Sequence, residues 1–542
     1  MKKRLLCRRP IWTAALLCLL LLQHCTKIDA PVNDNAAEYS GTVSVRSVIG
    51  PGTNGFYSIT NVFSGHAMEV FASSTADGGP VVQYANFNFQ NQKWVVKDLG
   101  SGYFSIMNGF SGKVLDVPGS TNETGRQLQQ YTWNTTNAQQ WRIEDVGGGA
   151  YRIINRGNGL AVTNQNNATG SGTAITQQPY TGSNAQKWIF TLDTRMTFAV
   201  NNGWVNSAQV YIDNDYNNYL TRYSGWNGGD GCVTTLLPNG SLLWSFQDSF
   251  FGEVTPNRAR IDNVFVRNAG FIQVNRSLSS YQQLNPIGAD GRAKTWVLVP
   301  GAANGDQDLY WGGPAQVLGN EVQMVMGHMH LNASNELEHQ RTDVVVFDAA
   351  SMQQKRVVHN RYTGSLPFDA SLFKANDGYT YMYTTQNVGI CGSRLYVARA
   401  ANHNITGAWE FYSNTGWTTN QPADANLQPI LEANATQPNV FYKDGKYYLV
   451  SQTTCYGLDI NIWESNSPVG PFVNQRTIYR IPQQYTLPEF VTYNAVVHHA
   501  LSREGELVVS YNINPTDFWS NFNNPGSADR YRPWVVRIYN WK

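Results

Sequence analysis

Charged residues are scarce in this chain of 542 residues. Asp, Glu, Lys and Arg together make up 14% of it, whereas an average soluble protein contains roughly 25%. The 39 basic and 38 acidic residues leave a net charge of +1, and no basic stripe is present. Because nucleic-acid binding requires a concentration of positive charge, we exclude nucleic acid as a partner.

Cysteine is also rare, and its spacing fits no metal site. Three of the six cysteines lie in the first 25 residues, which leaves Cys232, Cys391 and Cys455 for the folded part. An odd number allows at most one disulfide and one free thiol. We expect all three to be buried and inert.

Several common chemistries have no motif in this sequence. There is no Ser-His-Asp spacing, no phosphate-binding loop and no dinucleotide fingerprint. We therefore predict that no cofactor is required. A bound Ca²⁺ is compatible with the sequence, but no ligand cluster points to it, and we assign no metal ligands.

The apolar run near the N-terminus is too short to span a bilayer. Residues 11–22 are rich in apolar side chains, but a spanning helix needs about 20 such residues. Five basic residues precede the run: Lys2, Lys3, Arg4, Arg8 and Arg9. This pattern predicts an export signal over residues 1–25.

Cys25 closes this segment, which resembles the processing site of bacterial lipoproteins. The resemblance implies lipidation of Cys25, a membrane contact through the lipid, and a place at the outer membrane or cell surface. His24 departs from the small residue usual before the cysteine. Cleavage near Asp29 and Ala30, which would give a periplasmic or secreted protein, is therefore the alternative, and a retained anchor is a third.

Aromatic residues and glycine are abundant instead. Aromatics reach 13% and there are 48 glycines, a composition that favours short strands, many turns and sugar-stacking surfaces. The length exceeds what one hydrophobic core usually organises, so we expect at least two domains. Residues 26–52 show no periodic pattern and are predicted to be a flexible linker.

A threefold repeat follows the linker. Gln-x-Trp occurs at residues 92–94, 139–141 and 186–188, and successive tryptophans are 47 residues apart. Such regularity implies three equivalent lobes. Residues 53–193 resemble a ricin-type lectin β-trefoil, whose lobes each end in Gln-x-Trp; the resemblance implies that this tryptophan belongs to the core.

Sugar binding by a lobe requires a carboxylate, an amide pair and an aromatic face. The second lobe comes closest to this set, with Asp116, Tyr131, Trp133, Asn137 and Gln139. The first lobe carries Glu69, Tyr84, Asn91 and Gln92, and the third has Ala161 in place of the carboxylate. We expect the third lobe to be blind; a trefoil that only spaces or packs is the alternative.

From residue 197 to 542 the chain consists of short apolar segments separated by Gly, Asn, Asp and Pro turns. Five stretches share one layout of strand, turn and strand, which predicts a five-bladed β-propeller after the trefoil and an all-β protein. These stretches are Gly229–Asp248, Gly312–His330, Phe368–Thr385, Gln437–Gln452 and Asn494–Asn512.

This second region resembles the five-bladed propellers of glycoside hydrolase family 43. It is more closely similar to a bacterial propeller family that includes endo-acting D-arabinanases. The stretches that carry this likeness are Gly229–Gly231, Leu243–Gly252, Gly392–Arg399 and Asn494–Leu501. The resemblance implies a glycoside hydrolase domain.

Asp230 and Asp248 are the best candidates for a catalytic pair. Each lies nine residues from Asn239 in the turn Pro238–Ser241, so a hairpin folded there would bring both to one end. Directly opposed residues have Cβ atoms roughly 4.5–5.5 Å apart, and like-charge repulsion would raise one pKa. Glycoside hydrolysis needs such an acid and base. Alternatively, Asp230 caps a turn and Asp248 merely ends a strand.

Two further acids precede later units: Asp369 before the third and Glu489 before the fifth. In the family 43 pattern, acids from successive blades meet on the axis. Here the second unit starts at Trp311-Gly-Gly and the fourth at Gln437-Pro. This departure leaves the third acid unassigned.

Substrate contacts are predicted from residues in loops and near the axis. Trp226, Trp311 and Trp519 lie in Gly-rich or Asn-rich loops where an indole can stack on a sugar, Arg260 can bind a hydroxyl, and His498 can face the axis. The alternatives are a salt bridge between loops for Arg260 and a place in the core for His498.

These features predict an exported glycoside hydrolase that cleaves a polysaccharide, and the resemblance to arabinanases implies one that contains arabinofuranose. The trefoil would hold the enzyme on its substrate. A non-catalytic surface glycan-binding protein is the second hypothesis, and a scaffold for protein interaction is the third.

Overall fold

A computed structural model of the chain describes residues 49, 55–193, 196–198, 208–334, 336–433, 435–482, 489–502, 505–539 and 541–542. The expected signal peptide, Cys25 and all but one residue of the linker lie outside this set. In the part that is described, no helix is long and apolar enough to cross a membrane, and the single α-helix is α1 (Asn214–Tyr219). The all-β prediction is confirmed.

The N-terminal region forms one closed system of twelve strands in which β12 pairs with β1. Its strands are β1 (Gly55–Asn61), β2 (Ala67–Val70), β3 (Val81–Tyr84), β4 (Lys93–Gly100), β5 (Tyr103–Asn108), β6 (Val114–Asp116), β7 (Gln129–Tyr131), β8 (Trp141–Asp145), β9 (Tyr151–Asn155), β10 (Ala161–Asn164), β11 (Thr173–Gln178) and β12 (Trp188–Leu192).

The Gln-x-Trp tryptophans hold the three lobes together. Trp94, Trp141 and Trp188 are all fully buried in one core. Each indole N–H donates to the carbonyl 26 residues earlier, those of Met68, Leu115 and Val162, at 2.9–3.1 Å. The threefold pattern in the sequence is therefore a threefold set of identical core contacts.

The glutamines of the same motif brace the preceding loops. Gln139 accepts a hydrogen bond from the amide of Asn134 at 2.8 Å and donates one to the carbonyl of Thr132 at 2.9 Å. Gln92 and Gln186 make the corresponding pair of bonds in their own lobes. This use of both amide atoms explains why the repeat requires glutamine.

The C-terminal region contains five sheets of four to six strands and one of three. The three-stranded sheet holds β15 (Trp226–Gly229), β18 (Ser249–Val254) and β19 (Arg260–Val266). The first larger sheet holds β16 (Val233–Leu236), β17 (Leu242–Phe246), β20 (Ala269–Gln273) and β21 (Gln282–Gln283), and the second holds β22 (Asp308–Leu318), β23 (Glu321–Leu331), β24 (Leu337–Asp348) and β25 (Gln354–Tyr362).

The third sheet holds β26 (Ser371–Lys374), β27 (Tyr379–Val388), β28 (Gly392–Ala401), β29 (Trp409–Ser413), β30 (Gly416–Thr418) and β31 (Leu431–Ala433). The fourth holds β32 (Thr436–Lys443), β33 (Lys446–Gln452), β34 (Asp459–Ser465) and β35 (Val473–Arg480). The fifth combines β13 (Met196–Phe198) and β14 (Gln209–Asp213) with β36 (Phe490–Val497), β37 (Glu506–Pro515) and β38 (Arg532–Tyr539).

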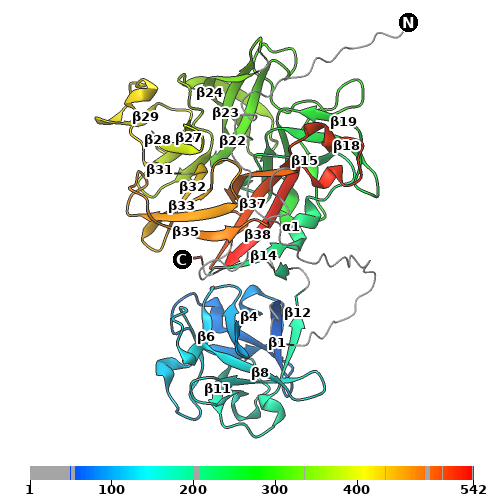
Figure 1. Ribbon diagram of the computed structural model, residues 1–542, viewed down its shortest axis with the longest axis vertical. Helices are drawn as coiled ribbons and strands as arrows, with labels where there is room; N and C mark the ends of the chain where they lie inside the picture. Colours follow the sequence, from blue (N-terminus) through cyan, green and yellow to red (C-terminus); the bar gives the residue numbers. More distant parts are fainter. Residues whose placement is uncertain are drawn as a thin grey trace, which may run out of the picture.

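These sheets follow one another around the C-terminal region, from green through yellow and orange to red in Figure 1. Strands β16, β22, β26, β32 and β36 contact each other in that order, and β14 pairs with β38, so that the start of the region joins its end. Apolar side chains fill the space between neighbouring sheets, as where Val325 and Val344 pack with Met382. This is the arrangement expected of a propeller, while the count of five blades stays a prediction.

The two regions meet through an apolar contact. Phe56 and Met107 of the trefoil pack in one cluster with Tyr211 and Tyr539 of the C-terminal region, and Trp133 lies against this cluster. In Figure 1 the trefoil adjoins the sheet that contains β14 and β38.

Two of the three expected inert cysteines are bonded to each other. Cys391 and Cys455 form a disulfide that links the turn between β27 and β28 to the loop after β33. One disulfide and one free thiol is the most that the odd number allowed, but the expectation that all three are buried is wrong, because Cys391 is half-buried and Cys455 is exposed. Cys232 is a buried free thiol.

Candidate functional site: a pair of half-buried aspartates

The hairpin of β16 and β17 places Asp230 and Asp248 opposite each other. The strands pair with Val233 opposite Ser245, and beyond that pairing the amide of Asp230 donates to the carbonyl of Asp248 at 3.1 Å. The turn that allows this contains Gly240, whose φ is +82°, a conformation that glycine adopts without strain. The prediction that the hairpin brings the two aspartates to one end is confirmed. Their catalytic role stays a prediction.

Two tyrosines that are far away in the sequence donate hydrogen bonds to the carboxylate of Asp230. Its Oδ2 accepts hydrogen bonds from the hydroxyls of Tyr493 at 3.0 Å and Tyr531 at 2.8 Å. Its Oδ1 is buried and has no hydrogen-bond partner among the described residues. Burial and the charge of Asp248 raise the pKa of Asp230, and the two tyrosines oppose that rise.

Asp248 has a more polar surrounding. Its Oδ2 lies 3.4 Å from a guanidinium nitrogen of Arg267, and its side chain keeps 16% of its surface exposed. Burial raises the pKa of Asp248, whereas Arg267 and the indole of Trp311 lower it. The two aspartates therefore differ in the sign of their nearest charge: Asp230 faces a carboxylate and neutral hydroxyls, while Asp248 also faces a cation.

Asp369 lies against β22, where a Cβ atom at Gly313 would stand 2.9 Å from the Cβ of Asp369. Gly327 pairs with Trp311 in the second sheet, and a Cβ atom at Gly327 would stand 3.1 Å from Oδ2 of Asp369. Burial raises the pKa of Asp369 to about 7. Trp311 thus has Asp248 beside its indole and Asp369 beside its strand partner.

Glu489 is not part of this cluster. It is exposed, and it lies just before β36, where its main-chain carbonyl accepts a hydrogen bond from the amide of Thr516 at 3.0 Å. Its role as a catalytic acid has no geometric support among the described contacts.

Three predicted substrate contacts are wrong because their side chains are buried. Trp226 has no exposed surface and packs on Phe246 with ring centroids 4.4 Å apart. The two ring nitrogens of His498 face the hydroxyls of Thr234 and Ser510 at 3.0 and 2.8 Å, and burial lowers its pKa to about 3. The alternative of a core histidine is therefore correct.

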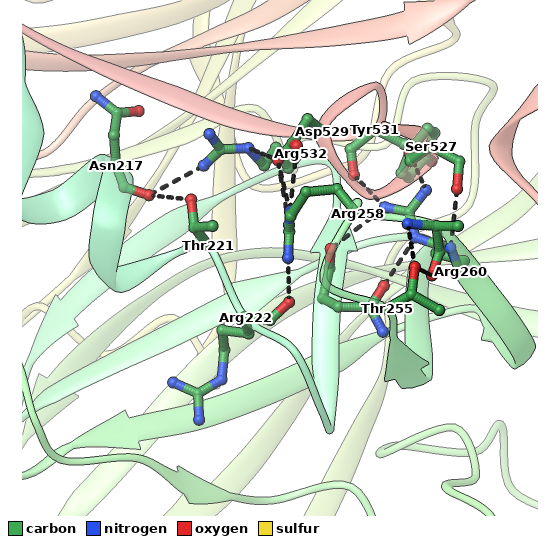
Figure 2. A network of polar contacts seen from close by, with 12 residues as sticks. Asn217, Thr221, Arg222, Thr255, Arg258, Arg260, Ser527, Asp529, Tyr531 and Arg532 are labelled. Atoms are coloured by element: carbon green, nitrogen blue, oxygen red, sulfur yellow. Dashed lines mark hydrogen bonds and ion pairs between the residues drawn. The ribbon is translucent and has the colours of Figure 1, made fainter. Parts of the chain in front are cut away.

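Arg260, the third, holds two chain segments together and is fully buried. Its guanidinium donates to the side chain of Asn227 and to the carbonyl of Ser527, each at 2.7 Å, and to the carbonyl of Tyr531 at 3.1 Å (Figure 2). No surface of this guanidinium is left for a substrate. Its indirect role is to fix the segment that ends at Tyr531.

Tyr493, Tyr531 and Arg267 were not among the residues predicted from the sequence. Tyr493 and Tyr531 lie 263 and 301 residues after Asp230. Their only signal is that Tyr493 directly precedes the fifth repeated unit at Asn494. Contacts of such range depend on how the sheets are arranged and not on any local pattern.

The second trefoil lobe has fewer free groups than predicted. Asp116 is buried, and its Oδ2 accepts a hydrogen bond from Gln129 at 2.6 Å. Trp133 lies against the contact between the two regions, and Gln139 braces its loop with both amide atoms. Tyr131 and Asn137 remain exposed. Gln139 is therefore a structural residue, while the sugar contact predicted for the half-buried Trp133 stays a prediction.

The first lobe combines a buried carboxylate with exposed aromatic rings. Glu69 accepts a hydrogen bond from Gln92 at 2.8 Å, and burial raises the pKa of Glu69. Phe87 and Phe89 are 57% and 60% exposed, with ring centroids 5.6 Å apart.

The amides predicted to orient a sugar in this lobe are used inside the protein. Asn91 is buried and donates to the carbonyl of Val70 at 3.1 Å, and Gln92 braces its loop. Asn91 and Gln92 are therefore structural residues. In the third lobe the corresponding position is the buried Ala161, which has no carboxylate. Among the described residues, no three His, Cys, Asp or Glu side chains are placed to hold a metal ion.

Comparison with known proteins reflects both regions. The family model described as "Domain of unknown function (DUF5005)" matches residues 213–541. The model described as "Ricin-type beta-trefoil lectin domain-like" matches residues 45–131, 90–178 and 137–219. No curated protein matches the chain.

Three solved structures are similar to parts of the chain. A "putative hydrolase" from Bacteroides ovatus is 33% identical, covers 64% of this chain and 94% of its own, and has a TM-score of 0.58. The designed threefold-symmetric protein ThreeFoil is 35% identical over 25% of this chain and 97% of its own, with a TM-score of 0.25. An exo-β-1,3-galactanase from Clostridium thermocellum is 31% identical over 26% of this chain and 31% of its own, with a TM-score of 0.26.

The raised pKa of Asp369 predicts how its replacement changes stability. The pKa is about 7 in the folded chain and about 3.9 when unfolded, so ionisation opposes folding as pH rises. Asp369→Asn removes this penalty. We expect it to raise the free energy of unfolding by about 1–2 kcal/mol at pH 8, after allowance for partial exposure, and not below pH 4. Urea unfolding at both pH values measures this, and an equal effect at both would contradict it.

Proposed function

Given that the chain belongs to the family described as "Domain of unknown function (DUF5005)", we propose from its site that it is a glycoside hydrolase that cleaves a polysaccharide with Asp230 and Asp248. The observation that carries the proposal is the opposed, half-buried carboxyl pair in which one acid faces a cation and the other does not. Glycoside hydrolysis requires two carboxyl groups of unlike protonation beside one bond.

The surroundings favour Asp230 as the general acid and Asp248 as the ionised partner. Arg267 stabilises the charge of Asp248, and that charge in turn keeps a proton on Asp230. Asp230 then protonates the leaving glycosidic oxygen as its bond to the anomeric carbon breaks. Asp248 either takes a proton from the water that attacks the anomeric carbon, or itself attacks that carbon. In the second case a covalent glycosyl-enzyme intermediate forms, and water later hydrolyses it.

The trefoil supports the substrate class. The matched family model is described as a lectin domain, and the lobe that contains Glu69 also presents two exposed phenylalanine rings. A domain that binds glycan raises the effective concentration of substrate at the hydrolytic site. We propose a polysaccharide that contains arabinofuranose, delivered to an exported or lipid-anchored enzyme.

A non-catalytic glycan-binding protein is the second candidate. It is favoured by the position of Glu489, which is exposed and leaves the acid set of family 43 incomplete. In that case the trefoil alone would bind glycan, and replacing the two aspartates would leave glycan binding unchanged.

Replacing either aspartate tests the choice. We expect Asp230→Asn and Asp248→Asn each to lower the release of oligosaccharides from arabinan or arabinogalactan by about 10²–10⁴-fold, the usual contribution of a positioned acid or base. Asp290→Asn, at an exposed turn, is the matched control and should act like the parent. Activity retained by both pair variants would refute the mechanism.

The lectin lobes can be separated in the same way. We expect Glu69→Gln to weaken binding on a glycan array roughly tenfold or more, because a carboxylate acceptor for sugar hydroxyls is lost. Asp116→Asn is the matched change in the second lobe, where Trp133 packs against the contact between the two regions, and should have little effect. The reverse order of effects would assign binding to the second lobe.

A further inference from the structure

The connection between β37 and β38 is a rigid arm over the three-stranded sheet. This arm, residues 516–531, contains two short 3-10 turns, Phe518–Asn521 and Ser527–Asp529. Arg258 in the neighbouring loop forms an ion pair with Asp529 at 3.1 Å, and Arg260 donates to the carbonyls of Ser527 and Tyr531 (Figure 2). Arg258 and Arg260 therefore attach the arm to the three-stranded sheet.

The two ends of the arm have opposite environments. Tyr531 is buried and donates to Asp230. Trp519 has 64% of its surface exposed, while Trp226 and Trp244 in the adjoining core have none. Exposing an indole on a well-anchored segment forgoes the free energy of burying a large apolar side chain. Tryptophan is enriched at binding interfaces, where its large ring supplies apolar contact area.

A row of aromatic rings connects the exposed indole to the acid. Trp519 lies 6.0 Å from Phe522, Phe522 lies 5.2 Å from Phe250, and Phe250 lies 5.3 Å from Tyr531, all between ring centroids. Phe250 is also close in sequence to Asp248, in the strand β18 that begins directly after it. Trp519 is thus no more than three ring contacts from the residue that binds Asp230.

We propose that Trp519 is a platform on which a sugar ring of the bound polysaccharide stacks, at a subsite a few units away from the bond between the two aspartates. The apolar C–H face of a neutral sugar matches the face of an indole. The inference rests on the proposed hydrolase function and specifies that the substrate is a chain of several sugars. Trp519 binds substrate and takes no part in proton transfer.

Residue-level footprinting tests the platform without turnover. Asp230→Asn protein is oxidised by hydroxyl radicals with and without arabinan or arabinogalactan, and each site is quantified by mass spectrometry. We expect the polysaccharide to lower oxidation of Trp519 at least twofold. Tyr442, which is 44% exposed at the turn of another sheet, is the internal control and should not change.

Kinetics gives the second arm of the test. Trp519→Ala should raise the KM for the polysaccharide roughly threefold to tenfold, the equivalent of one aromatic contact, and leave kcat and the KM for the shortest cleaved oligosaccharide unchanged. Tyr442→Ala is the matched control. A polysaccharide that the parent hydrolyses but that does not protect Trp519 overturns the platform alone. Protection of Trp519 without any hydrolysis supports the platform and overturns the proposed catalysis.

Discussion

The site depends on two carboxyl groups that one hairpin forces together in a place with little water. Directly opposed aspartates repel each other when both are ionised, and burial strengthens that repulsion. Each carboxyl group is bound by partners of a different kind. Two tyrosine hydroxyls donate hydrogen bonds to Asp230, and the Arg267 guanidinium forms an ion pair with Asp248. The two carboxyl groups therefore have unlike surroundings, and the charge of Asp248 raises the pKa of Asp230.

Most of the surrounding structure serves to deliver those partners. Tyr493 comes from β36 and Tyr531 from the arm before β38, so the last sheet must pack beside the first. The pairing of β14 with β38 joins the two ends of the C-terminal region. Arg260, buried between the arm and the three-stranded sheet, fixes the position of Tyr531. Closure of the sheets thus places the two hydroxyl groups that lower the pKa of Asp230.

Local patterns predicted what local contacts determine. The Gln-x-Trp repeat revealed the trefoil because each tryptophan and glutamine makes the same bonds in its own lobe. The Asn239-Gly240 turn placed Asp230 opposite Asp248 because hairpin register follows from turn position. Burial could not be read in this way: Trp226 and Arg260 lie in segments with the composition of loops, yet the arm and neighbouring strands cover both. Tyr531, 301 residues from its partner, had no local signal at all.

The dependence of kcat/KM on pH in Tyr531→Phe protein is the most direct test of this account. A general acid must be protonated, so activity falls as pH rises through the pKa of Asp230. The tyrosine hydroxyl lowers that pKa, and its removal should therefore move the alkaline limb to higher pH, with a similar shift in Tyr493→Phe. A lower activity with an unshifted profile, or a limb that moves to lower pH, would contradict the assignment of Asp230 as the acid.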